Sequence, residues 1–281
     1  MTSLALLAAV LLQSPSPTIV RTVGLTALTT KGAAVTALPL EEVAVVENGV
    51  AREVVRVEAD TRPLALVVIV DDSPAMGAGF RFDVVDAVER FLKQMPSGTR
   101  YSLWLTGDRP TRVVDWSEQP TDASRALKRT AQRGGNTLLD TLAEASRDVA
   151  KREVERTAVV AITGTGPEMS HRDKVRAVEE ALTNAGTFLV VQIREGEQDF
   201  EALEAQGYVL ERLTRETGGM LEDTLTTSGL SKALDRVGAV LSAQHTVAYR
   251  TEPDLKQRKV EIKVARPDVR VKVVAERGKI R

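Results

Sequence analysis

Three short apolar runs constrain the fold of this 281-residue chain more than any other feature of its sequence. They are LALVVIV at 64–70, TAVVAIT at 157–163 and TFLVVQI at 187–193. A strand that lacks polar alternation must be buried on both faces, which is the situation of a parallel strand covered by helices. Apolar residues recur at helical spacing between the runs, at 82–95, 138–150 and 172–185. The sequence therefore predicts an α/β fold with a doubly wound, mainly parallel sheet.

The segments that flank this unit have the pattern of β-structure. The first contains Asn48-Gly49 between two apolar runs, which is the signature of a tight hairpin. The second contains RKVEIKVA, where apolar and charged residues alternate as in a strand buried on one face. We predict that residues 18–62 and 246–281 pair into a small β-sandwich. Residues 63–245 would then form the α/β domain, inserted between the two halves of the sandwich.

The first 17 residues, MTSLALLAAVLLQSPSP, contain no charged side chain and carry an apolar run from Leu4 to Leu12. A run of this length has the size of a signal-peptide core and is too short to span a bilayer. We expect residues 1–17 to be a signal peptide and the protein to be exported to the periplasm, the cell surface or the medium. The usual basic residues before the apolar run are missing, so a frayed amphipathic start is the alternative. No other stretch of the sequence is long enough for a membrane span.

Composition excludes several classes of function. The chain has 38 basic and 39 acidic side chains, so no long-range field attracts nucleic acid or anionic lipid. With two histidines and no cysteine, the sequence offers no structural zinc site, thiol nucleophile or disulfide framework. It also lacks a G-K-[ST] phosphate loop and a G-x-S-x-G nucleophile elbow. We expect neither an enzyme nor a small-molecule substrate.

Ligands of doubly wound sheets bind where the carboxyl ends of the strands meet, so the segments after the strands form the candidate site. Three segments are expected there, at 71–79, 134–137 and 164–171. The first opens with the paired carboxylates Asp71 and Asp72. Adjacent side chains usually diverge, and no histidine or lysine is close in sequence. A structural role is therefore favoured over a general acid/base pair.

These segments resemble those of a known family. VIVDDSPAM, GGNTLLDTL and VVAITGTGPE resemble, in that order, the three site loops of a von Willebrand factor A domain. KGAAVTALPLEEVAVVENGVAREV, LTRETGGM and AQHTVAYRTE resemble segments of bacterial, acidobacterial-type, exported proteins related to that family. The resemblance covers nearly all of the chain after residue 17. It implies a non-enzymatic adhesion or scaffold module that binds other proteins.

The same resemblance implies a metal-ion-dependent adhesion site, built in that family from Asp-x-Ser-x-Ser, a threonine and a later aspartate. Mg²⁺ and Mn²⁺ prefer such oxygen ligands, and an open position on the ion can take a carboxylate of the partner. The matching metal ligands in this sequence are Asp71, Ser73, Asn136 and Thr137. Ala75 replaces the second serine and Gly164 replaces the late aspartate, so two of the family's ligands are lost.

We therefore predict a degenerate site that binds a protein partner directly, without a cofactor. The residues expected to form it are Asp71, Asp72, Ser73, Asn136, Thr137 and Thr165. Metal-dependent capture of a partner's carboxylate through Mg²⁺ or Mn²⁺ is the alternative.

Two further features of the sequence leave a choice open. Four basic residues share one face of the helix predicted over 122–133, namely Arg125, Lys128, Arg129 and Arg133. Such a face is usually solvated, and the alternative is a surface for an acidic partner. Trp104 and Trp116 flank a predicted hairpin at the sheet edge, either as packing residues or as exposed anchors for a partner.

Overall fold

The computed structural model describes residues 18–195, 200–253 and 258–274. The predicted signal peptide, residues 1–17, therefore lies outside the described residues, as does the end of the predicted sandwich beyond Val274. Within the described residues, no helix has both the length and the apolar character needed to cross a membrane.

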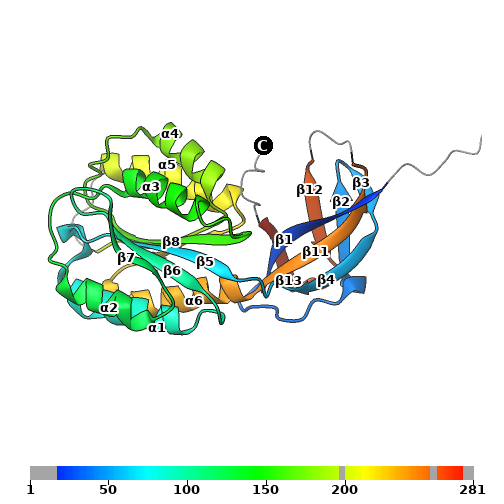
Figure 1. Ribbon diagram of the computed structural model, residues 1–281, viewed down its shortest axis with the longest axis horizontal. Helices are drawn as coiled ribbons and strands as arrows, with labels where there is room; N and C mark the ends of the chain where they lie inside the picture. The colour runs from blue at the N-terminus through cyan, green and yellow to red at the C-terminus, as the bar shows by residue number, and fades with distance from the viewer. Residues whose placement is uncertain (1–17, 196–199, 254–257, 275–281) are drawn as a thin grey trace, which may run out of the picture.

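A six-stranded sheet with the order β10-β9-β8-β5-β6-β7 forms the centre of the larger part of the molecule (Figure 1). Its strands are β5 (Leu64–Val70), β6 (Arg100–Leu105), β7 (Thr111–Ser117), β8 (Arg156–Gly164), β9 (Thr187–Ile193) and β10 (Met220–Thr224). All neighbours are parallel except β7, which pairs antiparallel with β6 at the edge. The three strands predicted from the apolar runs are buried along their whole length.

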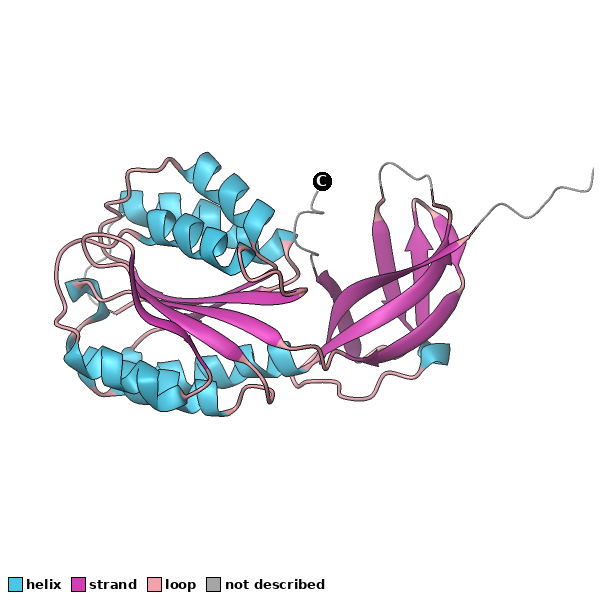
Figure 2. Ribbon diagram, in the orientation of Figure 1, coloured by secondary structure: helices cyan, strands magenta, loops and turns pink. Residues whose placement is uncertain are grey.

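Helices cover both faces of this sheet (Figure 2). One face carries α1 (Asp83–Lys93), α2 (Pro120–Arg129) and α6 (Leu230–Ser242), and the other carries α3 (Leu138–Ala150), α4 (Lys174–Asn184) and α5 (Phe200–Glu216). The predicted doubly wound α/β fold is therefore confirmed.

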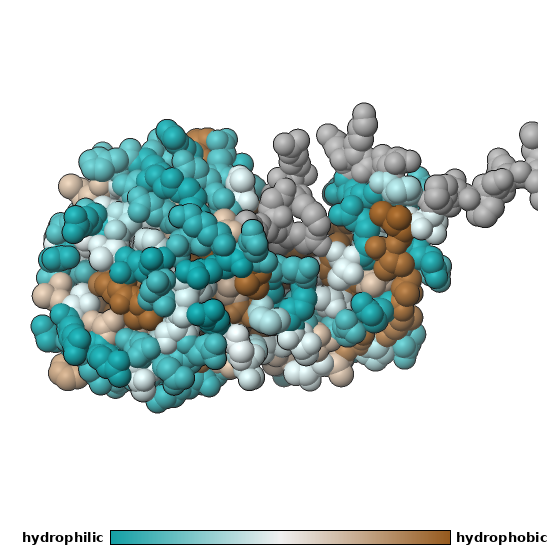
Figure 3. All heavy atoms as spheres, viewed as in Figure 1, coloured by the Kyte–Doolittle hydropathy of each residue, from teal (hydrophilic) through white to brown (hydrophobic). Residues whose placement is uncertain are grey.

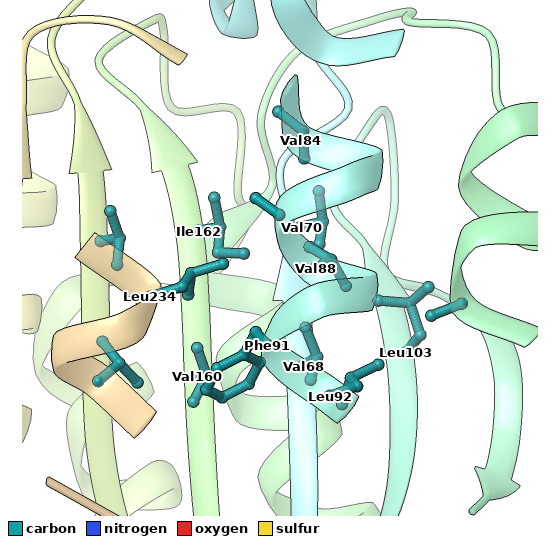
Figure 4. Packing of buried hydrophobic residues seen from close by; sticks show 14 of the residues in the cluster. Val68, Val70, Val84, Val88, Phe91, Leu92, Leu103, Val160, Ile162 and Leu234 are labelled. Carbon is teal, nitrogen blue, oxygen red and sulfur yellow. The ribbon is translucent and has the colours of Figure 1, made fainter. Parts of the chain in front are cut away.

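Alternation along β5 shows why its sequence has no polar positions. Val68 and Val70 pack under α1, together with Phe91 of that helix (Figure 4). Val67 and Ile69 point to the opposite core, under α3 and α4. Each such side chain contributes about 1.5–3 kcal/mol through burial, so apolar residues are favoured on both faces of the strand and no position is left for a polar one.

The two flanking segments form two antiparallel sheets that pack face to face. The first sheet has the order β13-β1-β11-β4 and contains β1 (Ile19–Thr29), β4 (Val54–Ala59), β11 (Gln244–Thr251) and β13 (Val269–Val274). The second has the order β12-β2-β3 and contains β2 (Val43–Glu47), β3 (Val50–Arg52) and β12 (Val260–Val264). Leu25 and Tyr249 from the first sheet meet Val45 and Ile262 from the second in one core. Both ends of the chain thus contribute to both sheets, as predicted, while the numbered domain boundaries stay a prediction.

Three local details differ from the sequence prediction or decide between its alternatives. The strand expected after Asn48-Gly49 divides at Glu53, because β3 pairs with β2 whereas β4 pairs with β11 in the other sheet. The helix predicted over 122–133 begins at Pro120 and ends at Arg129, so Arg133 lies in the loop beyond it. Trp104 and Trp116 are both buried, so they are packing residues and not exposed anchors.

Arg156, the first residue of β8, connects the sheet to the sandwich. It is 5% exposed, and its guanidinium group donates to the backbone oxygens of Asp60 (2.8 Å) and Leu241 (2.7 Å) and to Oε1 of Gln244 (3.0 Å). Because β8 begins at this junction, the amino ends of the parallel strands face the sandwich. Their carboxyl ends lie at the opposite end of the molecule (Figure 1).

Glu47 is a carboxylate that is fully buried in the sandwich. Its oxygens accept hydrogen bonds from the side chains of Tyr249 (3.0 Å), Arg258 (2.8 Å), Arg52 (3.1 Å) and Thr251. Burial alone would raise the pKa of Glu47, but the hydrogen bonds from Thr251, Arg258 and Tyr249 outweigh burial and lower it. The folded state therefore stabilises the ionised form of Glu47.

Replacing Glu47 by glutamine is expected to lower the free energy of unfolding by about 1–3 kcal/mol at neutral pH, because buried donors lose a charged acceptor. The folded pKa lies below the unfolded value of 4.5, so the carboxylate stabilises the fold above that pH. This stabilisation is lost as the pH falls through the folded pKa. Urea unfolding at pH values from 7 down to about 3 should therefore show a weaker acid dependence in Glu47→Gln than in the wild type. Glu41→Gln, at an exposed position, is the control, and an unchanged acid limb in Glu47→Gln would contradict the assignment.

Candidate functional site

The three loops predicted at the carboxyl edge of the sheet lie side by side there. Asn136 makes one isolated β-bridge to Gly107, after β6, and a second to Glu168, after β8. The backbone N–H of Asp71, after β5, donates to the oxygen of Ile162 in β8 (2.9 Å). The loop before α3 is thereby held between the ends of two strands, at the end of the molecule away from the sandwich (Figure 1).

Asp71 is the residue on which these loops converge. Its side chain is completely buried, and Oδ1 accepts a hydrogen bond from the backbone N–H of Ser73 (2.8 Å). Oδ2 accepts from the backbone N–H of Gly164 (2.9 Å) and from Nδ2 of Asn136 (3.0 Å). Two hydroxyl groups donate to the same carboxylate at 3.4 Å each, those of Thr106 and Thr163. The protein itself therefore supplies donors to both oxygens of this carboxylate.

The carboxylate of Asp72 accepts a hydrogen bond from a donor that Asp71 does not use. Its Oδ1 accepts a hydrogen bond from the backbone N–H of Gly107 (2.6 Å), and its backbone oxygen accepts from the N–H of Arg133 (3.0 Å). Burial raises the pKa of Asp72, and the hydrogen bond from Gly107 offsets only part of that effect. Asp72 thus ties the first loop to the loop after β6.

The remaining predicted site residues are also buried, but only some of their polar atoms form hydrogen bonds. The hydroxyl of Thr137 donates to the backbone oxygen of Thr106 (2.6 Å). In contrast, Oγ of Ser73, Oδ1 of Asn136 and Oγ1 of Thr165 have no hydrogen-bond partner among the described residues. These three neutral oxygens lie in loops that are joined through Asp71.

Ala75 and Gly164, the two positions that depart from the family motif, are packed against each other. A Cβ atom added at Gly164 would lie 3.1 Å from the backbone oxygen of Ala75 and 3.2 Å from its Cβ. One added at Gly166 would lie 2.4 Å from the Cβ of Ala75. The absence of side chains at the two glycines lets the loop after β8 close over the first loop.

The loop after β8 is anchored by residues that the sequence analysis did not single out. Oγ of Ser170 accepts from the backbone N–H of Asp140 (2.9 Å), and the Asp140 carboxylate accepts from the backbone N–H groups of His171 (2.9 Å) and Arg172 (3.1 Å). Burial alone would raise the pKa of Asp140, but the hydrogen bonds from the backbone N–H groups of His171 and Arg172 and from the Arg172 guanidinium (2.8 Å) lower it. An acidic residue in the first turn of a predicted helix could have suggested this role, because helix N-termini favour negative charge.

All six predicted site residues therefore come together in one buried cluster, and none is more than 3% exposed. Their predicted roles toward a partner or a metal ion stay predictions. In the described part of the chain, no three His, Cys, Asp or Glu side chains are grouped so that they could hold a metal ion. Exposed side chains surround the cluster, among them Met169, whose side chain lies over Gly135.

A doubly wound sheet with polar loops gathered at its carboxyl edge defines an α/β domain of the kind that binds ligands at that edge. The chain contains a von Willebrand factor type A domain, because residues 66–167 match the family model of that description. The predicted membership is thus confirmed at the level of the family, and the acidobacterial type stays a prediction. No curated protein matches the sequence.

Solved structures with the same fold include a von Willebrand factor type A protein from Catenulispora acidiphila. It has a TM-score of 0.54 and 12% identity, over 95% of this chain and 74% of that chain. Proximal thread matrix protein 1 from the mussel byssus has a TM-score of 0.53 and 16% identity, over 70% of this chain and 50% of that chain. A second structure of the mussel protein, with a zinc-occupied MIDAS motif, has a TM-score of 0.51, 14% identity and the same coverage. At these identities the similarity shows a shared fold.

Proposed function

We propose that this domain binds a partner protein through the loops at the carboxyl edge of its parallel sheet, without a bridging metal ion. Von Willebrand A domains generally act as interaction modules and not as enzymes. The observation that carries the metal-free mode is the set of protein donors around Asp71. Those donors satisfy the carboxylate and leave the loops in a fixed arrangement that does not depend on a cation.

The donor set of the cluster does not fit a divalent ion. Mg²⁺ prefers several carboxylate or other hard oxygens in an octahedron. Here both oxygens of Asp71 accept N–H groups, and Oδ1 of Asp72 accepts another. The unpartnered atoms are three neutral oxygens, and an aspartate at position 164 would crowd Ala75. The alternative, a metal held by Asp71, Ser73, Asn136 and Thr137, would have to break these hydrogen bonds.

Because the cluster is buried, we propose that it fixes the shape of the loops while exposed neighbours contact the partner. Large apolar side chains are exposed at this end, namely Phe82 (74%), Met169 (59%) and Leu225 (77%). A hydrogen bond from the hydroxyl of Thr227 to Asp83 (2.8 Å) joins the segment after β10 to the start of α1. Exposed apolar side chains next to polar loops are typical of protein-binding surfaces. The predicted signal peptide supports a role for this surface outside the cytoplasm.

The metal-free mode predicts that Mg²⁺ or Mn²⁺ does not change the melting temperature. An ion present at 100 times its dissociation constant would stabilise the fold by about 2.7 kcal/mol, which corresponds to a rise of about 5 °C or more for a domain of this size. The measurement is a thermal melt in EDTA, followed by titration of either ion to about 5 mM. A rise of that size would support the metal-dependent alternative.

Partner binding itself is tested with a surface variant. A partner isolated from the native envelope fraction should remain bound in EDTA and should bind Met169→Glu at least about tenfold more weakly. Val50→Glu, at a similarly exposed position in the sandwich, is the matched control. Equal losses in the two variants would place the binding surface elsewhere.

A further inference from the structure

A groove of about 730 Å³ lies between the edge strand β7 and helix α2, next to the loop cluster. Its floor is formed by the apolar side chains of Leu105, Val113 and Val114, and Ala126 of α2 borders it. Figure 3 shows apolar atoms exposed between β7 and α2, with hydrophilic atoms around them. Asp72 is also part of the lining, and its Oδ1 accepts a hydrogen bond from the N–H of Gly107. The groove is therefore an open hollow beside the predicted site, with apolar side chains in its floor and polar or charged residues in the rest of its lining.

Arginine side chains line the α2 side of this groove, two of them without an ion-pair partner. Arg125 is paired with Asp122 (2.8 Å). Arg129 and Arg133 are exposed, and neither forms an ion pair within 4.0 Å among the described residues. The remaining acidic residue of the lining, Asp115, is paired with arginines outside the groove, Arg112 (3.3 Å) and Arg152 (3.5 Å). The groove thus offers two cations that have no close ion pair, above an apolar floor. The charge of Arg133 also reaches Asp72, where it opposes the rise in the pKa of that carboxyl.

We propose that this groove binds an acidic peptide segment of a partner protein, with an aliphatic side chain placed between its carboxylates. The carboxylates would pair with Arg129 and Arg133, whose planar guanidinium groups favour such partners, and the aliphatic side chain would cover Val113 and Val114. This surface goes beyond the proposed function, because none of its contacts uses the exposed apolar side chains of Phe82, Met169 and Leu225. A partner held at the loops could nevertheless reach it, since Asp72 belongs to both.

Two other occupants fit the groove less well. Addition of a strand to the free edge of β7 is disfavoured, because the pairing of β6 with β7 shifts register twice and Trp116 has a φ of 44°. A single-stranded nucleic acid usually stacks its bases on aromatic side chains, and the described lining contains none. Charge and shape together favour an acidic peptide.

The test uses fluorescence anisotropy with a fluorescein-labelled peptide, DELDE, and the purified full chain. DELDE should bind, DESDE should bind at least about tenfold more weakly, and KKLKK should not bind. Arg129→Glu and Arg133→Glu should each weaken the binding of DELDE by about tenfold or more. Lys128→Glu is the matched control, because it makes the same charge change as Arg129→Glu on the same helix, at an exposed position outside the groove lining. All three replaced side chains are exposed, so circular dichroism should show unchanged folding.

Four results would overturn the proposal. They are no binding of DELDE, equal binding of DESDE, equal weakening by Lys128→Glu, and displacement of the peptide by a single-stranded oligonucleotide at similar concentration. The experiment contains neither a partner nor a metal ion. Its failure would therefore leave the proposed function of the loop cluster untouched.

Discussion

Replacing Asp71 by alanine is expected to lower the free energy of unfolding by about 3–5 kcal/mol, because several buried donors would be left without an acceptor. The backbone N–H groups of Ser73 and Gly164 and the amide of Asn136 would lose their acceptor inside the protein. Each unpaired buried donor costs about 1–3 kcal/mol. Urea unfolding followed by tryptophan fluorescence measures the effect, because Trp104 and Trp116 are both buried in the same domain.

The control for this variant is Asp86→Ala, which removes an exposed carboxylate from α1 and should change stability by less than about 0.5 kcal/mol. The loops should also lose their arrangement in Asp71→Ala, so partner affinity should fall as well. A cost below about 1 kcal/mol would show that this carboxylate does not hold the loops together. Unchanged partner affinity would contradict the proposed binding surface.

At the other end of the sheet, Arg156→Met is expected to lower the free energy of unfolding by about 3 kcal/mol, because three buried acceptors would lose their donor. Those acceptors are the backbone oxygens of Asp60 and Leu241 and the side chain of Gln244. Methionine fills similar space without donating a hydrogen bond. The measurement is again urea unfolding, followed by fluorescence for the α/β domain and by far-UV circular dichroism for the whole chain.

Arg56→Met is the matched control, because Arg56 is exposed and its ion pair with Glu58 (3.4 Å) lies in solvent. A stable Arg156→Met variant would show that the junction is held by other contacts. Separation of the fluorescence and circular dichroism transitions in Arg156→Met alone would show that Arg156 couples the sandwich to the α/β domain.

The sequence predicted the central sheet well because its strands are buried on both faces. The run 187–193 forms a strand over the same residues as predicted, and the helix 138–150 has the predicted bounds. The helix expected over 122–133 was placed wrongly at both ends. Proline at its first position starts it at Pro120, and extended backbone at Thr130 ends it. Apolar periodicity locates an element, whereas its ends depend on such local geometry.

The candidate site was predicted in part. Motif order located the loops, and the structure places all the named residues in one cluster. Thr106 and Thr163, which donate to Asp71, were not found, because a threonine at the end of a strand is also an ordinary β-forming residue. Arg156 was missed for a different reason, since its acceptors at Asp60 and Gln244 are far away in the sequence. Contacts between distant segments leave no local pattern.

The position of β1 in its sheet has a consequence for biosynthesis. Its two neighbours are β11 and β13, which follow the whole α/β domain in the chain. When the ribosome has released β1, neither of these strands yet exists, so β1 cannot complete its ladder. The whole inserted domain must therefore be synthesised before the sandwich can form. Pairing between strands so far apart in the sequence is slow.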